Sequence, residues 1–163
     1  MQITMTTYDE ELCKILESGV CTTKKRFEIL KIMRDEGIPT ICWMTPILPF
    51  INDTEDNILG ILKYCIEAEV KGIIFFGMGV TLREGDREYF YHALDRNFPG
   101  MKHKYIGTYG NAYNLPSPNE KKLMEHIRNE CIKAGIMCSV EDCFAYLHEL
   151  PEKYVQQSLF DKI

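Results

Sequence analysis

The sequence lacks any uninterrupted apolar run approaching the roughly 20 residues that a membrane-spanning helix requires. Its N-terminus also lacks the charged, apolar and small-residue regions that make up a secretory signal peptide. Neither route to a membrane is therefore visible among the 163 residues. We expect a cytoplasmic protein without a membrane partner.

An excess of positive charge is also missing. The chain has 24 acidic and 19 basic side chains, a formal net charge of −5, so no global field attracts it to nucleic acid. One local segment does interleave basic and aromatic side chains: Lys102–Tyr105, followed by Tyr109, Asn111 and Tyr113. This arrangement can follow a nucleic-acid strand by phosphate contact and base stacking, although tyrosines that pack an irregular loop onto the domain are the commoner explanation.

Cysteine is abundant, but the spacings typical of metal sites are absent. The closest spacings are five and seven residues, and the four histidines are far apart in the sequence. We therefore predict no metal site, and an odd number of cysteines inside apolar patterns favours reduced core thiols over a disulfide framework. The seven are Cys13, Cys21, Cys42, Cys65, Cys131, Cys138 and Cys143.

Short apolar runs alternate with helical patterns through the first part of the chain. Runs near residues 2–7, 39–48 and 72–77 predict three strands, with helices after each of them, the third spanning 87–98. Such alternation predicts an α/β fold with parallel strands, in an open sheet or part of a barrel. A long helix to about Ala134 and a last extended segment are expected beyond it.

The predicted domain organisation has three parts. Residues 1–98 form three parallel β/α units, residues 99–150 form a mainly helical extension packed on them, and residues 151–163 form a mobile tail. Half of a barrel leaves strand edges and an inner face uncovered, so self-association through those edges is expected.

Ligands of parallel α/β folds bind at the carboxyl ends of the strands, which selects three segments of this chain. Thr6 and Thr7 offer hydroxyl groups there, Pro46–Asp53 forms a stiff apolar turn, and Phe76–Arg83 contains two glycines and a guanidinium. The guanidinium of Arg83 is suited to a carboxylate or phosphate. Helix caps, a proline-rich strand exit and flexible glycines would explain the same residues without a ligand.

The sequence resembles the radical S-adenosylmethionine proteins related to spore photoproduct lyase, also described as DNA-repair-photolyase-like. The resemblance runs through nearly the whole chain, from Ile3–Cys13 through Arg26–Glu28 and Asp35–Pro39. It is most specific at Pro46–Asp53, which is similar to the family's fifth-strand exit near the adenine of S-adenosylmethionine. There Pro46, Phe50, Leu48 and Asp53 replace the two glycines, the isoleucine and the glutamate of the family pattern.

The resemblance implies that this chain is the C-terminal half of a partial TIM-type (β/α)6 barrel. The family's cluster motif, Cys-x-x-x-Cys-x-x-Cys, does not occur in it, so the [4Fe–4S] cluster and the reaction would require a missing N-terminal half as partner. The chain alone is then expected to be inactive and to bind no cofactor, and no catalytic residue is assigned. DNA is the implied substrate partner. The implied S-adenosylmethionine-side residues are Thr6, Thr7, Leu48, Asn52, Asp53, Phe76 and Arg83.

Two other readings of the chain are open. It could be a non-catalytic α/β binding module without a cluster half, or an enzyme of another barrel family with only a topological likeness. The C-terminal residues Gln156, Leu159 and Phe160 also match the Gln-x-x-Leu-Phe peptide with which bacterial repair proteins bind the sliding clamp. The alternative for Leu159 and Phe160 is that they pack the C-terminus onto the domain.

Overall fold

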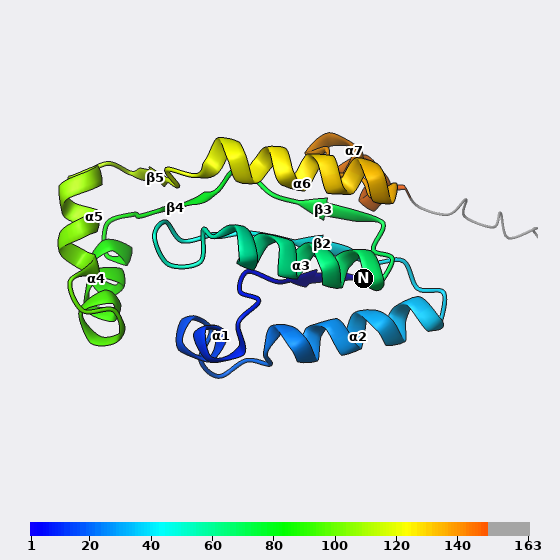
Figure 1. The fold of residues 1–163 in the computed structure, drawn as a ribbon, viewed down its shortest axis with the longest axis horizontal. Coiled ribbons are helices and arrows are strands. Elements are labelled where there is room, and N and C mark those ends of the chain that lie inside the picture. The colour runs from blue at the N-terminus through cyan, green and yellow to red at the C-terminus, as the bar shows by residue number, and fades with distance from the viewer. Residues whose placement is uncertain (150–163) are drawn as a thin grey trace, which may run out of the picture.

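A computed structural model describes residues 1–149 as a mixed α/β fold (Figure 1). The central sheet has the order β1-β2-β3, formed by Gln2–Thr4, Ile41–Trp43 and Gly72–Ile74. Both neighbouring pairs are parallel, which confirms the predicted strand direction. Within the described residues, no helix is both long and apolar enough to cross a membrane.

The regular strands are shorter than the apolar runs that predicted them. The run 39–48 pairs as a strand only through Trp43, and 72–77 only through Ile74. Pro46 and Pro49 have no backbone N–H to donate, so the ladder cannot continue through them. Beyond these strands each run continues as an irregular segment that is only partly in the core: Met44, Ile47 and Phe75 are buried, whereas Phe76 is exposed.

Three helices precede the third strand or connect the strands: α1 (Glu10–Leu16), α2 (Thr23–Asp35) and α3 (Glu55–Glu67). The side chain of Asp9 caps α1 by accepting the N–H of Leu12 at 2.7 Å. Thr54 caps α3 in the same way. Each cap satisfies one of the N–H groups that has no partner inside the helix.

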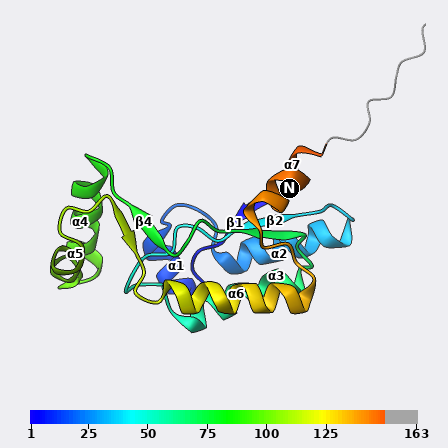
Figure 2. The same ribbon diagram turned by 90° about the horizontal axis from the view of Figure 1, so that it is seen from above.

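The two faces of the parallel sheet are covered by different helices (Figure 2). Helices α2, α3 and α6 (Glu120–Ala134) pack on the face that carries Cys42 and Ile73, and together they form the main core. Helix α7 (Val140–His148) packs on the opposite face against Ile41 and Ile74. Between α6 and α7, Met137 forms a parallel bridge with Gly72, which continues the strand order beyond β3.

A separate lobe, residues 79–116, is inserted between β3 and α6 (Figure 1). Two antiparallel strands, β4 (Gly79–Thr81) and β5 (Asn114–Pro116), connect it to the sheet region. Between them lie α4 (Asp86–Asn97) and α5 (Met101–Tyr109). The lobe has its own core of Leu82, Leu94, Tyr105 and Leu115.

The lobe changes two of the sequence predictions. The helix expected to cover the third strand corresponds to α4, which packs on α5 in the lobe; α6 takes the place on the sheet instead. The expected irregular loop after residue 100 is largely the helix α5. A sequence pattern locates each helix but does not give the partner against which its apolar face is buried.

Candidate functional site

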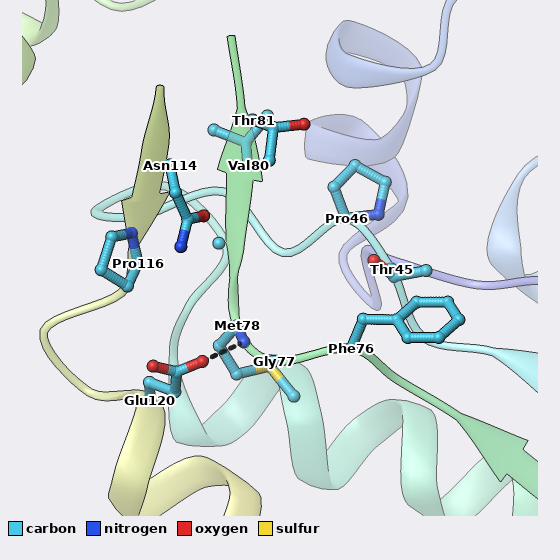
Figure 3. Close-up of a pocket in the computed structure, with 11 residues that line it drawn as sticks. Thr45, Pro46, Phe76, Gly77, Met78, Val80, Thr81, Asn114, Pro116 and Glu120 are labelled. Atoms are coloured by element: carbon cyan, nitrogen blue, oxygen red, sulfur yellow. Dashed lines mark hydrogen bonds between the residues drawn. The ribbon is translucent and has the colours of Figure 1, made fainter. Parts of the chain in front are cut away.

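Two pockets lie at the carboxyl ends of the parallel strands, one on each side of Pro46, and we call this region the rim. The first, of about 450 Å³, is lined by Thr45, Pro46 and the segment 76–81, with residues of β5 and Glu120 opposite (Figure 3). The second, of about 180 Å³, lies between the end of β1, α1 and the turn after Pro46. Because Pro46 lines both, the rim is one continuous candidate site.

The floor of the first pocket is held by Glu120 at the start of α6. Its Oε1 accepts the backbone N–H of Met78 at 3.0 Å (Figure 3). Gly77 has φ = +103°, and a Cβ added there would lie 2.5 Å from the same Oε1. The backbone angle therefore favours glycine at position 77, and a larger side chain would also have to displace the Glu120 carboxylate from Met78.

An exposed aromatic ring borders the same pocket. Phe76 follows the buried residue Phe75 directly, and 62% of its surface is exposed. Its ring centroid is 5.8 Å from that of Trp43, in a tilted arrangement. Together with Pro46, which lines the same pocket, Phe76 offers apolar surface against which a planar ring can stack.

The predicted polar residues of the rim form an internal hydrogen-bond network. Asn52 donates from Nδ2 to the Thr6 carbonyl at 2.9 Å and to Thr7 Oγ1 at 3.1 Å, and its Oδ1 accepts the N–H of Leu48 at 2.5 Å. Asn57 also donates to the Thr6 carbonyl, at 2.9 Å. Because the amide of Asn52 is fully engaged, it fixes the turn after Pro46 against the end of β1.

A buried ion pair supports the second pocket. Arg26 of α2 contacts Glu17 at 2.6 Å and donates to the Thr4 carbonyl at 3.0 Å. Thr6 donates its hydroxyl to the other oxygen of Glu17 at 2.7 Å. Although burial opposes its charge, Arg26 has a raised pKa because Glu17 and Cys21 accept hydrogen bonds from it.

Asp53 lies behind the rim and connects it to the segment between β5 and α6. It is 2% exposed, and Ser117 donates its hydroxyl to Oδ2 at 2.5 Å. Asn119 donates to the Asp53 carbonyl at 3.2 Å. Burial raises the pKa of Asp53, although the hydrogen bond from Ser117 acts in the opposite direction.

The structure brings together four of the seven predicted cofactor-side residues: Thr6, Leu48 and Asn52 line the second pocket and Phe76 lines the first. Thr7 and Asp53 are buried next to them. Arg83 was expected on the same rim as Thr7 and Asp53, but it is exposed in the lobe, beyond the end of β4. Hydrogen bonding to Arg83 lowers the pKa of Tyr113, so the two side chains are neighbours.

The sequence prediction missed several residues that shape the rim, namely Glu17, Arg26, Asn57, Ser117 and Glu120. Glu17 and Arg26 are distant in the sequence from the strand ends that were selected. Ser117 and Glu120 follow the lobe, and no local pattern shows that the chain returns to the rim after it. Asn57 could have been identified from the sequence. It is a polar residue in the first turn of α3, and it follows closely the turn after Pro46, whose Asn52 carbonyl accepts its hydrogen bond.

The interleaved basic and aromatic residues are used mainly in packing. Tyr105 is fully buried and donates its hydroxyl to the Pro49 carbonyl at 2.6 Å. Lys104 Nζ lies 4.1 Å from the ring centroid of Phe50, and Tyr109 donates to the Pro116 carbonyl at 2.6 Å. This confirms the packing interpretation for Tyr105 and Tyr109; contact with nucleic acid stays a prediction.

The predicted clamp-binding residues Gln156, Leu159 and Phe160 lie outside the described residues. Among known proteins, no family profile matches the chain. It is similar to uncharacterized proteins of Mycobacterium bovis and Mycobacterium tuberculosis, with 27% identity over 119 residues. The match covers 73% of this chain and 34% of each relative, so the chain spans about a third of the length of the curated relatives it matches.

Proposed function

We propose that this chain is the C-terminal part of a radical S-adenosylmethionine enzyme of the DNA-repair-photolyase-like kind, and that the rim supplies part of the cradle for S-adenosylmethionine and substrate. The observation that carries the proposal is the position of the two pockets around Pro46 at the strand ends. Pro46 belongs to the stretch that resembles the adenine-side element of that family. The exposed ring of Phe76 is next to it.

The arrangement of the sheet supports half of a partial (β/α)6 barrel. The strands follow one another in sequence order and are parallel, and α2, α3 and α6 all pack on the same face. A barrel places every crossover helix outside, which is consistent with this arrangement. The face that carries Trp43 would then be the inner one, with α7 covering part of it.

The cysteines of this chain do not fit a [4Fe–4S] cluster. Five of the seven are buried, and within residues 1–149 no three His, Cys, Asp or Glu side chains are grouped for a metal ion. Cluster ligands would come from an N-terminal half, whose cluster supplies the electron for cleavage of S-adenosylmethionine. Here the chain's own residues bind and orient: Pro46, Leu48 and Phe76 offer apolar contact, and Thr45 brings a hydroxyl-bearing side chain to the lining of the first pocket.

A non-catalytic binding module is the second candidate function. The observation that favours it is the saturated network around Thr6 and Asn52, because side chains already engaged with each other contribute little to a new ligand. Such a module would use the same pockets without chemistry. DNA as the substrate remains part of the first proposal.

No cofactor is expected to stay bound to this half of the cradle alone, but weak contact should be detectable at millimolar S-adenosylmethionine. Titration of the ¹⁵N-labelled chain with S-adenosylmethionine therefore tests the proposal. Binding in the rim should shift the amide signals of Ile47, Leu48 and Gly77 and leave the lobe residue Leu94 unchanged. Loss of ring stacking in F76A should weaken binding about tenfold, since a stacked ring contributes roughly 1–3 kcal/mol. The control Y89A removes a tyrosine that is 80% exposed in the lobe and should bind normally. Absence of rim shifts at millimolar ligand would contradict the proposal.

A further inference from the structure

A third pocket, of about 510 Å³, opens between the end of β3, α6 and the start of α7. Cys138 lines it from the extended segment between the two helices, and its side chain is half-buried. Acidic Glu120 and Glu141 line the pocket together with basic Arg128. A neutral small molecule carries no net charge for these groups to repel, so it can reach the thiol without electrostatic opposition.

A second thiol is sheltered next to this pocket. Cys131 lies in the last turn of α6 and is fully buried, and Cys138 packs against the same core cluster. The chain reverses between them, because Gly135 ends the helix with φ = +68° and Ile136 donates its N–H to the Cys131 carbonyl at 2.9 Å. Burial, followed by the nearby thiol of Cys138, raises the pKa of Cys131 to about 12.

The other cysteines differ from Cys131 and Cys138 in how solvent or a small molecule can reach their thiols. Cys21 is exposed, whereas Cys42 and Cys65 are buried in the main core. Cys143 is buried on the opposite face of the sheet, where its Sγ lies 3.9 Å from the Ile73 carbonyl oxygen. Among the described residues that line the third pocket, Cys138 is the only cysteine.

We propose that Cys138 and Cys131 form a thiol–disulfide exchange site that reacts with small neutral disulfides. The Cys138 thiolate attacks one sulfur of RS–SR, so that a Cys138–SR bond forms and RS⁻ leaves. The Cys131 thiolate then attacks the Cys138 sulfur, the Cys131–Cys138 bond forms and the second RS⁻ leaves. The two released thiolates take up the two cysteine protons; the small disulfide is reduced and the protein pair is oxidised.

The two steps should differ in rate. The raised pKa of Cys131 leaves little thiolate near neutral pH, so the mixed disulfide on Cys138 should accumulate first. The final bond would connect the end of α6 to the segment whose Met137 bridges to β3. The third pocket shares Phe76, Gly77 and Glu120 with the first pocket of the rim, but the proposed exchange uses only Cys131 and Cys138 and therefore does not depend on the cofactor function.

The test uses the full chain with C21S, which removes the exposed thiol. The reduced protein is incubated with 2-hydroxyethyl disulfide and followed by intact mass and by non-reducing peptide mapping. One adduct on Cys138 should appear first, and it should then convert to a species that lacks two hydrogens and contains the Cys131–Cys138 peptide pair. Mixed-disulfide formation at Cys42 and Cys65 should stay slower than reaction at Cys138.

Two further variants assign the roles. C138S should abolish both the adduct and the disulfide, whereas C131A should stop at the Cys138 adduct. Peptide mapping of the C21S protein requires no substitution in the core. It therefore shows whether the Cys131–Cys138 bond forms even if C131A does not fold. A Cys138–Cys143 bond, a persistent adduct that never resolves, or reaction of all buried thiols at one common rate would overturn the proposal.

Discussion

At the scale of single residues, charged and polar side chains at the rim are committed to one another. Glu17 and Arg26 are the clearest pair, because both are largely removed from water and each has a second partner in the end of β1. Such a pair contributes little compared with an apolar replacement, but removal of one member leaves the other charge buried without its partner.

We therefore expect E17Q to lower the free energy of unfolding by about 2 kcal/mol, the scale of a hydrogen bond to a charged group. Urea denaturation measures the change. The matched control is E11Q, whose ion pair with Lys14 is exposed and should change stability by less than about 0.5 kcal/mol. The double variant E17L/R26M should lose less unfolding free energy than the sum of the losses in the single variants E17L and R26M. Equal effects of E17Q and E11Q would contradict the assignment.

Asp53 gives a pH dependence whose sign follows from its raised pKa. The folded protein then binds the proton of Asp53 more tightly than the unfolded chain does. As the pH rises from the ordinary range of aspartate through the raised value, the unfolded chain loses its proton first, and stability falls. Above the folded pKa the contribution becomes constant.

The variant D53N keeps an acceptor for Ser117 but does not titrate. The unfolding free energy of the natural protein minus that of D53N should therefore decrease with rising pH across this window and then level off. Denaturation curves from pH 4 to 8 check the trend. A difference that increases with pH would mean that Asp53 is stabilised as a carboxylate.

The residue scale also shows where sequence patterns fail. Asp9 and Thr54 could be identified as caps because a cap lies next to the helix that it serves. The partners Asp53 and Ser117 are 64 positions apart, so their contact exists only after the lobe has been inserted between them. Burial of Thr6 and Asn52 likewise depends on contacts that no local pattern contains.

At the scale of elements, the existence of a helix or strand was easier to predict than its length or the element against which it packs. The apolar runs located all three parallel strands, but proline limited the pairing of β2. Helix α5 was missed because residues 101–113 are rich in lysine, tyrosine and glycine, although Met101, Tyr105 and Tyr109 recur every four residues and form one apolar stripe. That stripe was the available signal.

Tyr105 of α5 connects the lobe to the turn after Pro46. Its ring packs between Phe50 and Phe90, and its hydroxyl reaches the Pro49 carbonyl. Y105F should destabilise the protein by about 1 kcal/mol because the buried carbonyl loses its donor. Y105A should cost about 3–5 kcal/mol through the cavity that it leaves. Thermal denaturation measures both, and Y89F, at an exposed position of the same lobe, serves as the control.

At the scale of the whole molecule, the chain contains two cores of unequal size. The main core joins the sheet to α2, α3 and α6, whereas the lobe core has four buried residues. Contacts between them include those of Pro49 and Phe50 with Lys104, Tyr105 and Tyr109. A small core with few connections should open at a lower free energy than the rest of the structure.

Native-state hydrogen exchange under increasing urea tests this division. Amides of α4 and α5 should exchange through an opening of the lobe that leaves the amides of α3 and α6 protected. The exchange free energies of the two sets of amides should therefore differ at low urea and follow the same dependence on urea only near global unfolding. L115A removes a buried side chain of the lobe core and should lower the opening free energy of α4 and α5 by about 3 kcal/mol, with little effect on α3. L123A, in the main core, should lower the protection of both groups by a similar amount, because the lobe cannot remain protected once the sheet region unfolds. If L115A reduced the protection of α3 as much as that of α4, the two cores would unfold as a single cooperative unit.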